Sequence, residues 1–139
     1  MNSDRRLAWV LLVLRASIFL VMLMWTLDKF IRPDHAAAVF EHFYALAGLS
    51  WWASYVLGGG ELLLLLGFIL GIWQRFTYGV VLALHAVSTV SSYYQYFHPY
   101  QGTNLLFFAA WPMLAACLTV YLLRQSDAFA FDHWRRAPS

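Results

Sequence analysis

Four long apolar runs dominate the pattern of hydrophobic and polar positions along the chain. They predict helices over about residues 7–27, 52–73, 76–97 and 105–123, because each run reaches the roughly 20 residues that a hydrocarbon core about 30 Å thick requires. The stretch from Phe76 to Leu123, which contains the last two runs, has no Asp, Glu, Lys or Arg. The pattern therefore predicts an all-α integral membrane four-helix bundle that forms a single domain over residues 1–139.

Two amphipathic segments accompany the four runs. After Pro33, apolar and polar side chains alternate at helical spacing, which predicts a short interfacial helix over about residues 34–46 that lies on the membrane surface. In the tail, residues 125–139, Phe129, Phe131 and Trp134 stand between charged residues. Such a mixture is suited to resting on lipid headgroups or to docking a small partner.

Composition and charge support a membrane location. The chain has 139 residues, of which 62% are hydrophobic and only 12% are charged, and this is far from the composition of a soluble domain. The lipid bilayer is thus the expected partner, whereas the scattered basic residues and the net charge of +2 do not support nucleic-acid binding. Both termini are predicted to be cytoplasmic, because Lys and Arg concentrate on one side of the predicted spans. That side carries Arg5, Arg6, Arg75, Arg124, Arg135 and Arg136, and the other carries Lys29 and Arg32.

Three ionisable residues are predicted to lie near the bilayer midplane. Counting about 1.5 Å per residue from the centre of each span places Arg15, Glu61 and His85 within a few ångströms of one level. A charge at this depth costs a few kcal/mol and normally faces the bundle interior, where it finds a partner. We therefore expect an ion pair between Arg15 and Glu61. The pair either lines a site for a polar headgroup or a proton, or only fixes helix packing and register.

A polar stripe extends this candidate site. Along the predicted helix 76–97, Tyr78, His85, Ser88, Ser92 and Gln95 fall on one face. The stripe either supplies interhelical hydrogen bonds or forms the wall of a polar cavity. Two residues that share a face of the last helix complete the set. The candidate intramembrane site comprises Arg15, Glu61, His85, Ser88, Ser92, Gln95, Asn104 and Trp111.

The sequence predicts no metal site and no redox-active thiol pair. The five histidines include no His-x-x-x-His spacing, and Cys117 is the only cysteine. No ligand set for haem, flavin or an iron–sulfur cluster is visible. Whether the protein is an enzyme is left open, because no complete catalytic set can be recognised.

Several short motifs resemble those of a known family. They are Leu14-Arg15, Leu27-Asp28-Lys29-Phe30 and Gly60-Glu61-Leu62, followed by Gly67 and Gly71. With these motifs the chain resembles the DoxX/DoxD family of small four-helix bacterial membrane proteins. The resemblance implies an inner-membrane subunit associated with a respiratory or sulfur redox system, a quinone as the ligand, and a membrane or peripheral redox protein as partner. It also matches Arg15 and Glu61 to the family's buried charged positions.

Three functional hypotheses follow. In the first, the polar site accepts a quinone-type headgroup: His85 or Arg15 donates a hydrogen bond to a quinone oxygen and Glu61 handles a proton. In the second, the chain is a non-catalytic accessory or assembly protein. The third is transport of a small solute or proton. Because four helices enclose only a narrow pathway, transport would call for a homo-oligomer.

Overall fold

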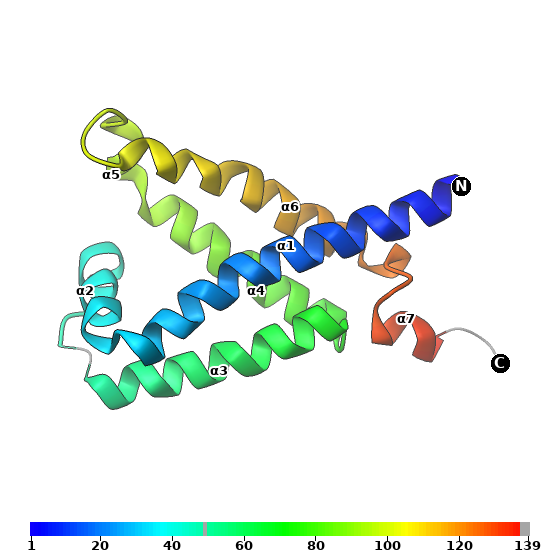
Figure 1. Ribbon diagram of the computed structural model, residues 1–139, viewed down its shortest axis with the longest axis horizontal. Helices are drawn as coiled ribbons and strands as arrows, with labels where there is room; N and C mark the ends of the chain where they lie inside the picture. The colour runs from blue at the N-terminus through cyan, green and yellow to red at the C-terminus, as the bar shows by residue number, and fades with distance from the viewer. Residues whose placement is uncertain (49, 137–139) are drawn as a thin grey trace.

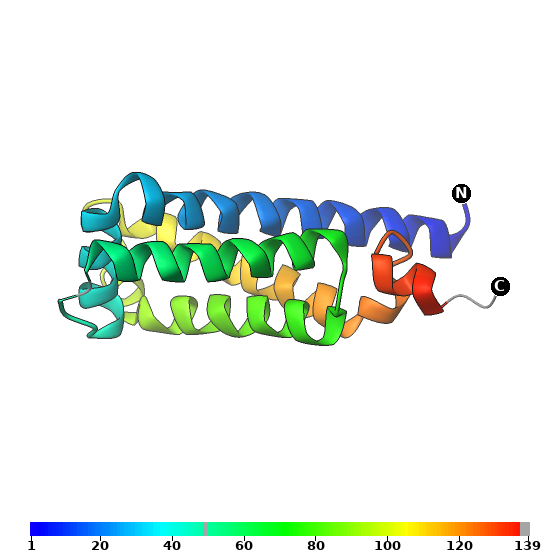
Figure 2. The ribbon, with the colours of Figure 1, turned by 90° about the horizontal axis from the view of Figure 1, so that it is seen from below.

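A computed structural model describes residues 1–48 and 50–136, and every regular element in these residues is a helix. The predicted all-α fold is confirmed for this part of the chain. Figures 1 and 2 show the long helices side by side, with shorter helices at their ends. The long helices are α1 (Ser3–Ile31), α3 (Trp51–Leu70), α4 (Gln74–Ser91) and α6 (Ala110–Leu122). The short ones are α2 (Pro33–Tyr44), α5 (Tyr93–Phe97), α7 (Phe131–Arg136) and the 3-10 turns η1 (Asn104–Ala109) and η2 (Arg124–Ser126).

The long helices form a bundle in which sequential neighbours are antiparallel. Helix α1 packs mainly against α3, and α4 mainly against α6, while contacts between α3 and α4 and between α1 and α6 close the ring. The N-terminus, helix α7 and the turn between α3 and α4 lie at one end of the bundle (Figure 1), which we call the terminal end. Helices α2 and α5 lie at the opposite end.

The bundle is apolar both inside and outside. Its core consists of Leu11, Ile18, Leu65, Phe68, Tyr78, Val81, Cys117 and Val120. Large apolar side chains also cover the outer faces, with Leu63 and Leu106 each 73% exposed. Such extensive exposed apolar surface is characteristic of contact with lipid.

Three helical segments are long and apolar enough to cross a membrane. They are Ser3–Ile31, Trp51–Leu70 and Asn104–Leu122, and they indicate a multi-pass membrane protein. Helix α4 has 18 residues but does not reach the same apolar content, because its first turn contains Gln74 and Arg75 and its middle contains His85. Four spans therefore remain a prediction, although α4 packs within the same bundle.

The predicted helix 76–97 is in fact two helices, α4 and α5, because the helix is interrupted at Ser92, although its limits agree with the structure to within two residues. At Ser92 the backbone turns away from helical geometry, and its N–H donates to Thr89 three residues back. The Tyr96 hydroxyl also donates to the Thr89 carbonyl, at 2.8 Å. This side-chain bond stabilises the break, since it satisfies a carbonyl that a continuous helix would pair with a backbone N–H.

Other boundaries also differ from the predicted ones. Helix α1 begins at Ser3, four residues before the predicted start, because the Asn2 side chain accepts a hydrogen bond from the Arg5 N–H at 3.0 Å. Helix α3 ends at Leu70, since Gly71 adopts a positive φ of 71°. A helix is present as α2 where the interfacial helix was expected, and its position on the membrane surface stays a prediction. Within the predicted tail, residues 125–136 are described and contain α7, whereas residues 137–139 lie outside the described residues.

Candidate functional site

Arg15 is the centre of a buried polar network at the terminal end. Its side chain is only 2% exposed and donates to the Tyr78 hydroxyl at 2.7 Å, to Asp127 Oδ2 at 2.8 Å and to the Phe129 carbonyl at 3.2 Å. The Tyr78 hydroxyl in turn donates to the same Asp127 oxygen at 2.8 Å. Asp127 is fully buried and belongs to the segment that follows α6. This segment therefore supplies the counter-ion of the buried Arg15.

A second set of polar contacts fixes the C-terminal segment to the start of α4. The Gln74 backbone N–H donates to Asp132 Oδ2 at 2.9 Å, where a carboxylate interacts favourably with the positive end of the helix dipole. The Asp132 N–H donates to the Gly71 carbonyl at 3.0 Å, and Arg136 donates to the Gln74 side chain. The segment from Arg124 to Arg136 thus packs against the bundle through its backbone as well as its side chains.

Glu61 has a different cationic partner. Lys29 Nζ lies 2.9 Å from Glu61 Oε2, and Thr26 donates to the same oxygen at 3.1 Å. Thr26 and Lys29 are three residues apart and so share a face of α1. Lys29 lies near the end of α1, and its side chain leans back toward Thr26, as side chains in helices do, which brings it to Glu61.

The expected ion pair between Arg15 and Glu61 is therefore wrong. Arg15 lies beside Gly71, because its Nη1 is 2.9 Å from the point where a Cβ on that glycine would stand. Glu61 is ten residues earlier in the chain, which corresponds to about 15 Å along α3. Counting from the centre of each helix placed Arg15 at the wrong level relative to Glu61, because α1, with 29 residues, and α3, with 20, are offset along the bundle and the first turns of α1 extend beyond the end of α3.

Among the described residues, the His85 side chain makes one hydrogen bond to a neighbouring helix. Its Nε2 lies 3.0 Å from the Ala110 carbonyl oxygen on α6, and since a carbonyl only accepts, this nitrogen carries the proton. Further along α4, the Ser92 hydroxyl donates to the Ser88 carbonyl at 3.1 Å. These contacts match the interhelical and intrahelical bonding that polar side chains supply between membrane helices.

Two of the remaining three candidates, Asn104 and Trp111, belong to η1 and α6. Asn104 Nδ2 donates to the His98 carbonyl at 2.9 Å and so stabilises the turn between α5 and η1. Trp111 is 49% exposed and packs against the Tyr96 ring at a centroid distance of 5.5 Å. The eight predicted residues thus fall into separate places and are not collected into one cavity.

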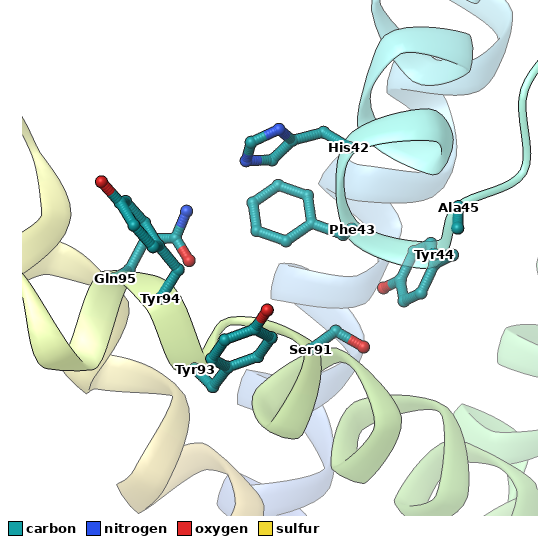
Figure 3. Close-up of a pocket in the computed structure, with 8 residues that line it drawn as sticks. All are labelled: His42, Phe43, Tyr44, Ala45, Ser91, Tyr93, Tyr94 and Gln95. Carbon is teal, nitrogen blue, oxygen red and sulfur yellow. The ribbon is translucent and has the colours of Figure 1, made fainter.

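Gln95 lines a hollow of about 710 Å³ between α2 and α5 (Figure 3). Gln95 is only 7% exposed, and its Oε1 is buried without a hydrogen-bond partner among the described residues. In Figure 3, His42 and Phe43 extend from α2 toward Gln95 and Tyr94 on the facing wall. The hollow is lined by His42, Phe43, Tyr44, Ala45, Ser91, Tyr93, Tyr94 and Gln95. It combines aromatic rings with one unsatisfied amide.

Sequence reasoning missed Asp127 and Lys29 as the partners of the buried charges. Asp127 was assigned to a headgroup-facing tail and Lys29 to the membrane surface. A signal for Asp127 was present, since it follows the last apolar run within four residues and could therefore fold back onto the bundle. In the described part of the chain, no group of three His, Cys, Asp or Glu side chains is placed to hold a metal ion.

Comparisons with protein-family models, with curated proteins and with solved structures give no match.

Proposed function

We propose that this protein is a DoxX-like, four-span inner-membrane subunit associated with a redox system, and that it binds a quinone-type headgroup in the hollow between α2 and α5. The observation that carries this proposal is the buried Oε1 of Gln95, which has no partner among the described residues. A buried polar atom without a hydrogen bond costs about 1–3 kcal/mol, so a turn of the Gln95 amide that brings Oε1 into the hollow, where a ligand supplies the bond, gains affinity.

The chemistry of the hollow fits a flat ring that carries oxygen atoms. A carboxamide has both a donor and an acceptor, so the Gln95 side chain can donate to a quinone carbonyl and accept from a quinol hydroxyl. Phe43, Tyr93 and Tyr94 supply aromatic faces on which such a ring can stack. A lining of apolar rings with one polar group that orients the ligand is typical of small-molecule sites.

In this proposal, the two buried ion pairs have a supporting role. Arg15 and Glu61 are already neutralised by Asp127 and Lys29, and apolar core residues such as Leu65 and Phe68 lie between the two pairs. The two pairs therefore anchor helices, while the ligand lies at the end of the polar stripe. The same apolar layer argues against a polar pathway for a solute through one copy of the chain.

A thermal-shift experiment on the full chain in detergent tests the proposal. A short-chain ubiquinone at a concentration well above its Kd should raise the melting temperature, because a ligand that binds only the folded state stabilises it. The variant Gln95→Leu should lose most of the shift. The matched control is Gln101→Leu, an exposed glutamine in the turn after α5, which should keep it. No shift in the unmodified protein would refute quinone binding.

A second candidate is a non-catalytic accessory protein, and a specific observation favours it. In both charge pairs each charge has its counter-ion within the chain, which is what a structural role requires. If neither ubiquinone nor its quinol form shifts the melting temperature, while the chain still co-purifies with a redox enzyme from its native membrane, the accessory function is favoured.

A further inference from the structure

Charge is distributed very unevenly between the two halves of the bundle. The terminal half carries six arginines besides the paired Arg15, against Asp4 and Asp132, which gives a formal charge of +4 without the chain ends. The other half carries two cations, Lys29 and Arg32, against four acidic residues, which gives −2. Together with the neutral Arg15–Asp127 pair, these values add up to the net charge of +2. The terminal end is therefore complementary to anions.

An apolar hollow lies at the same end. It has a volume of about 360 Å³ and is lined by Leu70, Ile72, Phe129, Phe131 and Trp134. The Trp134 indole N–H donates to the Ala128 carbonyl at 2.8 Å, which fixes the ring while leaving it 71% exposed. The hollow is thus formed by the end of α3 on one side and by the C-terminal segment on the other.

Two arginines are close in the chain to residues that line this hollow, since Arg75 is three residues after Ile72 and Arg135 directly follows Trp134. Arg75 follows Gln74, which contacts both Asp132 and Arg136, and Arg135 precedes Arg136 in α7. The docking of α7 on α4 therefore brings the chain positions of Arg75 and Arg135 to the same region. Both side chains are exposed and have no hydrogen-bond or ion-pair partner in residues 1–48 and 50–136.

We propose that the terminal end holds an anionic phospholipid, with an acyl chain in the hollow of Leu70, Ile72, Phe129, Phe131 and Trp134 and its phosphate between Arg75 and Arg135. Charge complementarity selects an anionic lipid over a neutral one, and the exposed tryptophan is characteristic of the headgroup level. A peptide partner would satisfy the apolar hollow equally well, but in a membrane the adjoining lipid is present at much higher concentration. The proposal rests on the four-span arrangement within the proposed function, but not on quinone binding.

Native mass spectrometry of the full chain in detergent tests this site. The protein is incubated with equal amounts of phosphatidylglycerol and phosphatidylcholine that have the same acyl chains. We expect one phosphatidylglycerol to be retained in about tenfold preference over phosphatidylcholine. The double variant Arg75→Gln with Arg135→Gln should lose this preference, and Phe131→Gln should lower retention of both lipids.

The matched control is the double variant Arg5→Gln with Arg6→Gln, which removes the same charge from the same end of the bundle. It should keep the preference, since these residues lie in the first turn of α1 and are far in the chain from every residue that lines the hollow. An equal loss in both double variants would show diffuse attraction and overturn the defined site, as would equal retention of the two lipids by the unmodified protein. If soluble glycerol phosphate displaces the lipid at similar concentration, the acyl-chain part of the proposal is wrong. Melting curves confirm that each variant is folded.

Discussion

The two buried ion pairs differ in burial and in what they connect. Arg15 and Asp127 are 2% and 0% exposed, and they join α1 to the segment after α6 across 112 positions of the chain. The side chains of Lys29 and Glu61 are 10% and 24% exposed, and they join α1 to α3 across 32 positions. The Arg15–Asp127 pair joins the first long helix to the C-terminal segment. The Lys29–Glu61 pair connects two helices that already pack closely together.

This difference determines how each pair responds to loss of a partner. Removing water from two charges is expensive, and the remaining charge cannot regain hydration when the site is fully buried. Arg15 Nε and Asp127 Oδ1 already have no hydrogen-bond partner among the described residues, so the site has no spare groups to compensate. The pair of Lys29 and Glu61 is less enclosed, and the flexible stem of Lys29, near the end of α1, allows its ammonium to move toward the headgroup level.

The largest expected effect comes from Asp127→Asn. The substitution keeps the side-chain shape but leaves the Arg15 charge buried without a counter-ion, which should lower the free energy of unfolding by about 3–5 kcal/mol. The measurement is unfolding of the purified protein in mixed micelles with increasing denaturing detergent, followed by tryptophan fluorescence.

The control for this prediction removes both charges. Arg15→Met with Asp127→Leu replaces the pair by apolar groups and should recover most of the lost stability, since no charge is then left uncompensated. If the double variant is as unstable as Asp127→Asn, the uncompensated charge is not the cause of the lost stability. Lost packing at the C-terminal segment would then be the cause.

Gly71→Ala should have the next largest effect, and it tests whether the Arg15 pair depends on the docked segment. A Cβ at Gly71 would overlap Ala130 and lie 2.9 Å from Arg15 Nη1, at a φ of 71°. Left-handed strain and overpacking together should cost about 2–4 kcal/mol. Limited proteolysis should then cut the segment after Arg124 faster than in the unmodified protein.

Gly102→Ala is the matched control for strain alone. Gly102 also has a positive φ, of 52°, but a Cβ there meets nothing within 4 Å. It should cost only about 1 kcal/mol and leave cleavage of the C-terminal segment unchanged. Equal effects of the two alanines would mean that contact with Ala130 and Arg15 does not hold the segment in place.

The contrast between the two pairs also explains what could be predicted from the sequence. The helices and the interfacial α2 could be located because apolar periodicity and length are local properties. Individual boundaries were less predictable, since the break at Ser92 depends on a side-chain bond from Tyr96 that periodicity does not report. The polar stripe was recognised, and Gln95 on it lines the hollow between α2 and α5.

Partners of buried charges were not predictable in the same way. Depth counted from predicted span centres placed Arg15 and Glu61 at one level, but the true register depends on where α1 begins and on how far it extends past α3. Asp127 lies outside all the predicted spans, so counting within spans could not find it. Lys29 was placed at the surface because its Cα is near a helix end, although its side chain reaches back to Glu61.

The smallest of the three effects is expected for Glu61→Gln, and it is the most direct comparison with Asp127→Asn. The amide oxygen can still accept from Thr26, and the Lys29 charge can move toward water, so only the charge-assisted part of the interaction is lost. We expect a loss of about 1 kcal/mol in the same unfolding experiment. Glu41→Gln, at an exposed position on α2, is the matched control and should change stability by less than about 0.5 kcal/mol. If Glu61→Gln were as damaging as Asp127→Asn, the Lys29 charge would be held as firmly as that of Arg15, and the difference in burial would not decide how strongly this bundle depends on each of its internal charges.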